Sequence, residues 1–345
     1  MMDLLSFFII CVKVLLVFAG TLLAVLIMVY AERRVSAFMQ GRLGPNRVGP
    51  QGLLQPIADG IKFLMKEDII PDGVNKPIYL LAPVIMLIPA LMTFAVIPFG
   101  STITLFDRDI ILQVADVNIG ILYILALTSI GVYGIVLAGW ASNSKYTLIG
   151  GLRSSAQLIS YELALGLSVV SIILMSGSLR LNDIVADQQG HLLSWYVFKQ
   201  PLAFLIFLIA TYAETNRLPF DLAEAEQELV GGYHTEYSSM KFAMFFMSEY
   251  ANMITAAALT VTLFFGGWDV PLLDEKSLGI WGAMLSVASF ILKMGFFLFL
   301  FIWIRWTFPR FRYDQLMKLG WKVLLPLSLI NIFITGGYLT LAALK

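Results

Sequence analysis

Cysteine and histidine are almost absent from this chain. Its 345 residues include one cysteine, Cys11, and two histidines, His191 and His234. Disulfide bonds, cysteine-ligated iron–sulfur clusters and structural zinc sites all need more of these ligands than the chain supplies. We therefore expect the chain to hold neither a redox metal centre nor any other metal site of its own.

Charged residues are also scarce. They make up 13% of the chain, against 59% hydrophobic residues, and the mean hydropathy is +0.83. A soluble domain carries about 25% charged residues. Basic and acidic residues balance at 23 each, so an excess of positive charge that would indicate nucleic-acid binding is lacking. The composition predicts an all-α, polytopic integral membrane protein without a nucleic-acid partner.

Eight apolar runs are long enough to cross a bilayer, which takes about 20 residues for a hydrocarbon core of about 30 Å. We expect a single membrane domain over residues 1–345, with no cleavable signal, because the first run lacks a basic start and a small-residue cleavage site. The predicted spans cover about residues 4–30, 78–97, 119–140, 156–175, 195–213, 240–265, 280–304 and 323–341.

The distribution of lysine and arginine predicts the orientation in the membrane. The first, third, fifth and seventh connections between spans carry fifteen of these residues, whereas the second, fourth and sixth carry three. Basic residues are enriched in cytoplasmic loops. We therefore expect the odd connections to face the cytoplasm and both termini to lie on the opposite side.

Residues 52–66 are predicted to form a short amphipathic helix in the membrane interface. Their apolar residues recur at helical spacing, whereas Asp59, Lys62 and Lys66 fall on another face. The segment is too short and too charged to span a bilayer.

The fifth connection, residues 214–237, is strongly acidic. Its single basic residue is Arg217, and its six acidic residues are Glu214, Asp221, Glu224, Glu226, Glu228 and Glu236. Asp221, Glu224 and Glu228 would share one face of a helix, where mutual repulsion raises the pKa of carboxyl groups and suits them to proton exchange near neutral pH. The alternative is a solvated acidic loop, although apolar residues are interleaved with the acids and Glu214 directly ends a span.

Some ionisable residues fall inside predicted spans. Glu162 is expected about six residues into the fourth span, roughly 9 Å from its end, and Glu249 and Lys293 lie at similar depth in the sixth and seventh spans. Charges inside a membrane usually find a partner, so Glu249 and Lys293 could pair. Such a pair would serve either proton transfer or only structure.

Two basic connections suggest contacts rather than catalysis. The segment Gly41–Gly52 alternates turn-forming residues with Arg42 and Arg47 and matches no nucleotide-binding loop, so we expect its arginines to meet a partner subunit, an anionic lipid or the loop acids. The connection that begins at Arg305 carries five basic residues, which ordinary membrane anchoring would also explain.

Longer motifs resemble one family. The chain is similar to the H subunit of bacterial NADH:quinone oxidoreductase, the counterpart of subunit 1 of mitochondrial NADH dehydrogenase in respiratory complex I, over nearly its whole length. The motifs that carry the resemblance are AERRVSAFMQGRLGPNRVGPQGLLQPIADGIK from Ala31, GWASNSKYTLIGGLRSSAQLISYE from Gly139, AETNRLPFDLAEAEQELVGGYHTEYSS from Ala213 and PRFRYDQLMKLGWK from Pro309.

The resemblance implies a role at a quinone site. It places Glu162, Glu214, Glu224, Glu226 and Glu228 in an acidic chain that couples quinone chemistry to proton translocation. To these we add Glu249 and Lys293 because both are intramembrane charges. Around the quinone chamber and its loop, the resemblance implies Arg33, Asp59, Lys62, Arg217, Phe220, Asp221 and Tyr233, with the amphipathic helix beside the chamber entrance.

The resemblance also implies partners. Quinone would be the substrate, whereas NADH, FMN and the iron–sulfur clusters would belong to partner subunits, because this chain lacks cluster ligands and a nucleotide fold. We expect contacts with the quinone-site and iron–sulfur subunits of a peripheral arm, with small membrane subunits and with the lipid bilayer. The expected location is the inner membrane of a bacterium or, alternatively, of a mitochondrion.

Two other functions compete with this interpretation. A homologous membrane subunit of an energy-converting hydrogenase would handle no quinone, but the unbroken motif GPNRVGPQGLLQPIAD favours the quinone branch. A stand-alone ion transporter is disfavoured by the lack of internal repeats and by the long basic connections, which suit docking to other subunits.

Overall fold

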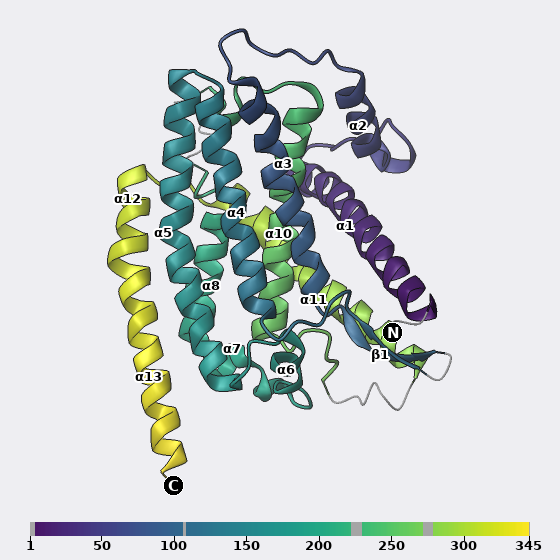
Figure 1. Cartoon of the computed structure of the whole chain (residues 1–345), viewed down its shortest axis with the longest axis vertical. Helices are drawn as coiled ribbons and strands as arrows, with labels where there is room; N and C mark the ends of the chain where they lie inside the picture. Colours follow the sequence, from purple (N-terminus) through teal and green to yellow (C-terminus); the bar gives the residue numbers. More distant parts are fainter. Residues whose placement is uncertain (1–3, 106–107, 222–229, 272–278, 345) are drawn as a thin grey trace.

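The computed structural model of the chain is a bundle of helices that run back and forth between two ends (Figure 1). The structure describes residues 4–105, 108–221, 230–271 and 279–344. In chain order its elements are α1 (Leu4–Met39), η1 (Pro50–Gly52), α2 (Gln55–Met65), α3 (Lys76–Met92), η2 (Thr93–Val96), β1 (Gly100–Leu105), β2 (Arg108–Leu112), α4 (Gly120–Ala141), α5 (Lys145–Ser176), α6 (Leu181–Ala186), η3 (Leu192–Ser194), α7 (Tyr196–Lys199), α8 (Pro201–Glu214), η4 (Gly232–His234), α10 (Ser239–Phe264), α11 (Ile280–Thr307), α12 (Tyr313–Lys318), the π-helix η6 (Leu319–Leu324) and α13 (Leu325–Ala343).

The two ends of the bundle differ in what they carry. One end, called the α2 end, carries α2 and the C-terminus of α1 (Figure 1). The other end, called the hairpin end, carries α6, α7 and the antiparallel pair β1 and β2, in which Ile103 lies opposite Ile110. Both ends of the chain lie toward the hairpin end (Figure 1). The described parts of the first, third, fifth and seventh connections therefore lie toward the α2 end.

Seven helical segments in the described part of the chain are long and apolar enough to cross a membrane. They are α1, α3 with η2, α4, α5, α10, α11 and the continuous helix from α12 to α13. The all-α, polytopic membrane fold expected from the composition is confirmed.

The span expected over residues 195–213 is interrupted. Residues Tyr196–Lys199 form the separate helix α7, and α8 begins only at Pro201. Proline lacks the amide hydrogen that a continuous helix needs and restricts the residue before it, so Gln200 adopts a non-helical conformation. With 14 residues, α8 is about 21 Å long, which is shorter than the hydrocarbon core of a bilayer.

Two other helices are longer than the apolar runs that predict them. Helix α1 continues to Met39 instead of ending near Tyr30, and α5 begins at Lys145 instead of near Ala156. The extra residues include charged, polar and small ones, which interrupt an apolar run without ending a helix. Glu162 therefore lies near the middle of α5, because the helix begins before the predicted span does.

The hairpin of β1 and β2 was not expected from the sequence. Thr102, Ile103, Ile110 and Ile111 are β-branched and favour strands, but the segment is short and follows a long apolar run. Ser286 of α11 holds the hairpin, since its hydroxyl accepts a hydrogen bond from the Ser101 amide at 3.0 Å. The small helix α6 was likewise not expected.

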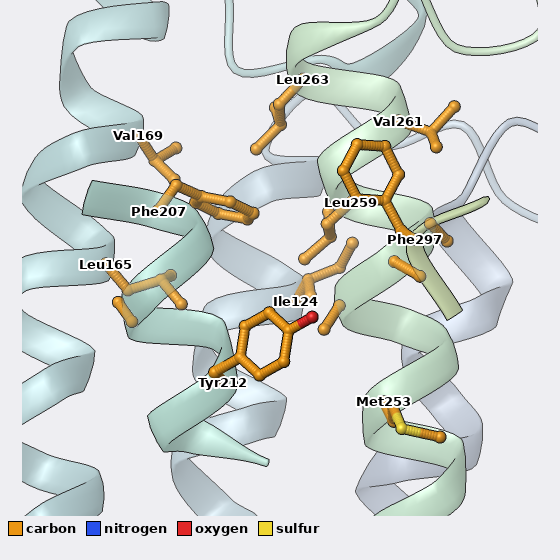
Figure 2. Close-up of a cluster of buried hydrophobic side chains, with 14 of the residues drawn as sticks. Ile124, Leu165, Val169, Phe207, Tyr212, Met253, Leu259, Val261, Leu263 and Phe297 are labelled. Carbon is orange, nitrogen blue, oxygen red and sulfur yellow. The ribbon is translucent and has the colours of Figure 1, made fainter. Parts of the chain in front are cut away.

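Apolar side chains of α4, α5, α8, α10 and α11 pack together in the centre of the bundle, as part of a larger buried cluster (Figure 2). Phe207 of α8 and Phe297 of α11 are 0% and 2% exposed. Because lipid is as apolar as these side chains, close packing rather than escape from water holds membrane helices together. Small residues permit that packing: a Cβ on Gly134 of α4 would lie 2.9 Å from the Cβ of Met86 in α3.

Buried polar side chains fasten α13 to the bundle. Asn331 donates to the hydroxyl of Ser171 in α5 at 2.9 Å, and Gln200 donates to the hydroxyl of Thr335 at 3.0 Å. Hydrogen bonds between membrane helices contribute about 0.6 to 2 kcal/mol each. The break before α8 thus places Gln200 where it joins the two helices.

Replacing Gly150 by valine should destabilise the protein. A Cβ on Gly150 of α5 would lie 2.8 Å from backbone atoms of Gly232 in η4, and backbone cannot rotate aside as a side chain can. Overpacking of this kind costs about 1 to 3 kcal/mol. We expect a lower midpoint of thermal unfolding in detergent.

Gly166→Val is the matched control, because it adds the same side chain to the same helix where nothing lies within 4 Å. Equal midpoints for the two variants would contradict the close approach of α5 and η4.

Candidate functional site at the α2 end

A polar cavity of about 240 Å³ lies at the α2 end. It is formed by the C-terminal turns of α1 and α11, the N-terminal half of α10 and the segment that follows α8. Charged and polar side chains dominate its wall, which consists of Glu32, Arg33, Ser36, Asn216, Arg217, Leu218, Asp221, Phe246, Glu249, Tyr250, Arg305 and Trp306.

Glu32 is the centre of this wall. Its carboxylate accepts hydrogen bonds from Arg217 at 3.3 and 3.4 Å and forms a second ion pair with Arg305 of α11. Glu32 and Arg217 are each 8% exposed. Tyr250 of α10 also bonds to Glu32, and the Arg217 guanidinium lies 4.4 Å from the centre of the Tyr250 ring. One carboxylate therefore connects α1, α10, α11 and the segment after α8.

A buried amide fixes the segment that carries Arg217. Gln157 of α5 donates to the backbone carbonyls of Ala213 and Phe220, both at 2.8 Å. These two carbonyls flank the turn at Asn216, and the Asn216 side chain in turn donates to Ser154 at 3.3 Å. The turn is thereby held against α5, which positions Arg217 for Glu32.

Asp221 lies at the rim of the cavity beside a second arginine. Arg310 donates to its carboxylate at 3.1 Å. Burial disfavours the charged form and raises the pKa of Asp221 to about 6, while the Arg310 guanidinium opposes this rise and the Glu249 carboxylate adds to it. Asp221 therefore changes its charge close to physiological pH.

Glu249 joins this cavity to a smaller one. It lines the 240 Å³ cavity and also an adjacent cavity of about 20 Å³, whose wall includes Glu214, Thr128 and Asn252. The buried Tyr233 hydroxyl donates to the Glu249 carboxylate at 2.8 Å. A cavity of this size has room for about one water molecule, which the polar groups in its wall could bind.

The next two carboxylates are linked through neighbouring hydroxyls of α4. Thr128 forms a hydrogen bond with Glu214, and Ser129, the next residue, donates to Glu162 of α5. Glu214 also lines a second small cavity of about 20 Å³, whose wall includes Thr255 of α10. Asp221, Glu32 and Glu249 thus line the larger cavity together, and from Glu249 the carboxylates continue into the bundle through Glu214 to Glu162.

Helix α2 is attached beside the cavity by an ion pair. Asp59 binds Arg33, which lines the cavity, and Lys62 of the same helix lies 3.8 Å from Asp59. Asp59 and Lys62 do not belong to the cavity wall. Phe220 is buried and packs on the ring of Tyr161, with centroids 5.6 Å apart, so it attaches the segment after α8 to α5.

The expected pair of Glu249 and Lys293 is wrong. The Lys293 ammonium donates to the backbone carbonyls of Phe265, Gly267 and Asp269 at 2.7 to 3.0 Å, just beyond the C-terminus of α10. Glu249 lies sixteen residues before Phe265, about 24 Å away along the helix. Carbonyls at a helix C-terminus attract a cation, which explains where the ammonium binds.

Glu224, Glu226 and Glu228 lie outside the described residues, so the face that they would share with Asp221 stays a prediction. Several residues of the site were not expected from the sequence: Glu32, Tyr250, Arg305 as a partner of Glu32, and the hydroxyls of Thr128 and Ser129. The sequence could have identified Glu32, since it is an acidic residue at the end of an apolar run. It could not have identified the hydroxyls, because serine and threonine are common in membrane helices.

This arrangement suits charge and proton handling. Sheltered carboxylates that alternate with hydroxyls, an amide and small cavities can hold protons and respond to a charge placed in the larger cavity. The arginines paired with Glu32 and Asp221 place positive charge at and beside the larger cavity, which favours a ligand with a polar or anionic group.

Known proteins resemble the chain over nearly its full length. A family model described as NADH dehydrogenase matches residues 12–336. Three similar relatives are H subunits of NADH-quinone oxidoreductases. The chain is 58% identical over 335 residues to copy 1 of this subunit from Geobacter sulfurreducens, covering 94% of this chain and 93% of that protein. It is 54% identical over 342 residues to copy 2 from Koribacter versatilis, covering 96% of each. It is 50% identical over 329 residues to the one from Flavobacterium johnsoniae, covering 94% and 93%.

Replacing Glu32 by glutamine should strongly destabilise the α2 end. The change keeps the shape but leaves Arg217 and Arg305 without their shared counter-charge. Removing one member of a buried pair costs about 3 to 5 kcal/mol. Thermal unfolding in detergent measures the loss.

The control is Asp314→Asn, which breaks an exposed pair with Lys318 whose side chains are 63% and 66% exposed. An unfolding midpoint for Glu32→Gln as high as that of the control would show that the pair does not hold the helices together.

Proposed function

The chain belongs to the NADH dehydrogenase family. On that premise we propose that it is the membrane subunit of a bacterial NADH:quinone oxidoreductase. In this proposal the chain forms the wall of the quinone chamber and couples quinone reduction to proton translocation. The observation that carries the proposal is the polar cavity at the α2 end, from which carboxylates continue into the bundle through Glu249 and Glu214.

The chemistry divides between this chain and its partners. Reduction of a quinone to a quinol takes two electrons and two protons. In the proposal the electrons come from NADH through FMN and iron–sulfur clusters on partner subunits, while this chain binds and orients the quinone and handles charge. Arg217, Arg305 and Arg310 would favour the headgroup as it gains negative charge, and Asp221 can exchange a proton near neutral pH.

The chamber residues in the proposal are those at or beside the cavity. Arg33, Arg217 and Asp221 line it, and Tyr233 holds Glu249 at its inner end. Asp59 attaches α2 to Arg33 of α1, and Lys62 lies beside Asp59 on the same helix. The apolar residues Ile57, Ile61 and Leu64 of α2 are exposed toward the surroundings, as suits an entrance for an isoprenoid tail. Phe220 keeps the loop in place.

Coupling would follow from electrostatics. A change of charge in the chamber alters the protonation of the nearest carboxylate, and each carboxylate then influences the next. The order Glu32, Glu249, Glu214, Glu162 leads this change away from the chamber. In the proposal Glu224, Glu226 and Glu228 belong to the same chain of acids, and Lys293 supplies a fixed positive charge beyond the far end of α10.

The proposal also assigns sides and partners. With its basic connections, the α2 end faces the bacterial cytoplasm and receives the quinone-site and iron–sulfur subunits of the peripheral arm, whereas both termini face the other side of the inner membrane. Small membrane subunits and lipid surround the bundle.

Glu214→Gln should lower the quinone-dependent activity of the complex while its oxidation of NADH with an artificial acceptor is retained. Glutamine keeps the size of the side chain but cannot exchange a proton, so we expect quinone-dependent NADH oxidation and proton pumping to fall by about tenfold or more. NADH oxidation by an artificial acceptor, which bypasses the quinone, should persist. Glu67→Gln, at an exposed acid between α2 and α3, is the control.

Equal loss of both activities would mean failed assembly and would argue against a coupling role for Glu214. Full quinone activity in the assembled variant would do the same.

Asp221→Asn should remove a pH dependence. Below about pH 6 the wild-type carboxyl is neutral and above it is charged, so a step that needs the charge beside Arg310 slows as the pH falls through 6. The variant is neutral at every pH and should lose this inflection, with a rate at pH 7.5 near the wild-type rate at pH 5. Because the folded protein raises this pKa and so prefers the neutral form, asparagine should not impair folding. An unchanged inflection near pH 6 would exclude Asp221 as its source.

A further inference from the structure

An apolar groove at the hairpin end has no part in the proposed function. It has a volume of about 490 Å³ and lies between α1, α10, α11 and the hairpin. Its wall consists of Lys13, Leu16, Val17, Gly20, Thr21, Leu23, Ala24, Ile27, Phe94, Phe99, Leu112, Gln113, Ile254, Val287, Phe290, Ile291 and Met294.

The groove is polar at one end only. Lys13 and Gln113 lie together, since the Lys13 ammonium donates to the backbone carbonyl of Gln113 at 3.2 Å. The remaining polar wall residue, Thr21, has its hydroxyl bonded to the Val17 carbonyl of its own helix at 2.7 Å. A groove that is apolar along its length and cationic at its mouth matches a ligand with an oily tail and an anionic head.

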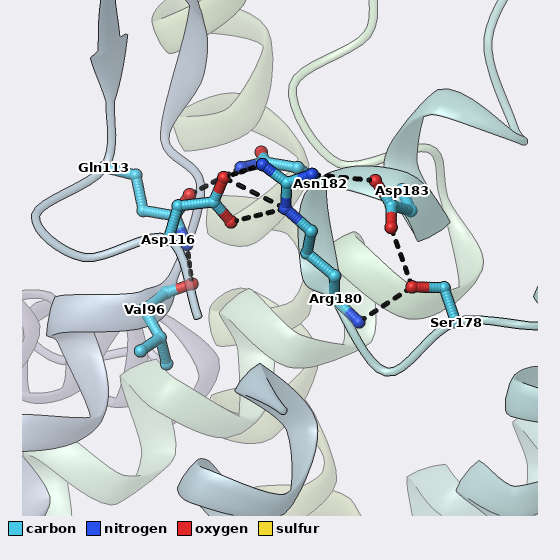
Figure 3. Close-up of polar contacts among 7 residues, drawn as sticks. All are labelled: Val96, Gln113, Asp116, Ser178, Arg180, Asn182 and Asp183. Carbon is cyan, nitrogen blue, oxygen red and sulfur yellow. Dashed lines mark hydrogen bonds and ion pairs between the residues drawn. The ribbon is translucent and has the colours of Figure 1, made fainter. Parts of the chain in front are cut away.

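Hydrogen bonds and ion pairs surround Gln113, which lies at the mouth of the groove (Figure 3). The Gln113 side chain donates to the Val96 carbonyl at 2.5 Å and accepts from Asn182 at 2.6 Å. Beside it, Arg180 pairs with Asp116 and Asp183. The carbonyl that receives Lys13 is thus fixed by a network of side chains from the hairpin segment and α6. An ammonium has three donors, so one bond to this carbonyl leaves donors for a phosphate oxygen.

The dimensions fit an acyl chain. Lys13 and Ile27 bound the groove along α1 and lie fourteen residues apart, about 21 Å, whereas one leaflet contributes about 15 Å of hydrocarbon. A tilted helix reconciles the two lengths, and α1 is inclined to the other helices (Figure 1).

We propose that this groove binds an acyl chain of an anionic phospholipid from the leaflet at the hairpin end, with the lipid phosphate on Lys13. The groove opens sideways, because Leu16, Leu23, Ile27 and Ile291 are exposed. In the membrane-length part of α1 only 11% of residues are buried within the chain, the smallest share among the candidate spans. The lipid would therefore fill the space between α1 and α11 and support the helix that carries Glu32.

Filling the groove should expel the lipid. Gly20 lines the groove and has nothing within 4 Å of an added Cβ, so Gly20→Leu would place a side chain in the volume of the acyl chain. The intact complex would be delipidated, incubated with dioleoyl phosphatidylglycerol, and its retained lipids counted by native mass spectrometry. We expect Gly20→Leu to retain one lipid fewer than wild type. Gly337→Leu, at an exposed glycine of α13 that is equally unobstructed, should retain the wild-type number.

The head of the lipid is tested separately. Wild type should retain phosphatidylglycerol over phosphatidylcholine with the same chains, and Lys13→Gln should reduce this preference about fivefold, the contribution of one basic residue near an anionic lipid. Lys13→Arg keeps the charge and should restore the preference.

Three results would overturn the proposal. They are equal lipid counts in wild type and Gly20→Leu, an unchanged phosphatidylglycerol preference in Lys13→Gln, and loss of a protein subunit from the Gly20→Leu complex, which would identify the occupant as a partner helix. None of these readouts depends on quinone activity, so they test the lipid site separately from the proposed function.

Discussion

The bond between one buried carboxylate and two arginines is the constraint on which the α2 end depends. Glu32, at the end of α1, cannot remain charged inside the protein without compensation, because burial of an unpaired charge costs several kcal/mol. Arg217 and Arg305 supply that compensation from two different parts of the chain. Since each arginine must reach the same carboxylate, α1, α11 and the turn after α8 are drawn together, and the space between them becomes a polar cavity rather than a packed interface.

This constraint also explains how a charge at the rim could be felt deeper in the bundle. In a site of low dielectric, each charged group strongly influences the next. Glu249 lines two cavities, Glu214 lines the next, and adjacent hydroxyls of α4 connect Glu214 with Glu162. The proposed coupling needs no large movement of helices, only small changes in protonation passed between sheltered carboxylates. The arginines that stabilise the resting state are the same groups that would meet a reduced headgroup.

The membrane fold and two residues of the cavity were predictable from the sequence, whereas the partners of the charged residues were not, for physical reasons. Apolar runs predicted the all-α membrane fold, because about 20 apolar residues are needed to cross a bilayer whatever the surrounding structure. Asp221 and Glu249 were singled out as ionisable groups near or inside spans, and both line the cavity. The partners were not predictable. Arg305 meets Glu32 across 273 residues of sequence, and Lys293 binds the carbonyls beyond α10 rather than Glu249. Such pairings are decided by how helices tilt and where they break, as at Pro201, and one sequence read locally does not contain that information.

The most direct test is a structure of the intact complex at a resolution that shows ordered water. We expect water between Asn216, Glu249 and Glu214, and again beside Thr128 and Asn252, forming a continuous line from the Glu32 cavity to Glu162. If these spaces were closed by apolar side chains of a neighbouring subunit, or if Glu249 and Glu214 turned outward to bulk solvent, the carboxylates could not act as a connected chain. The α2 end would then serve only to dock the other subunits.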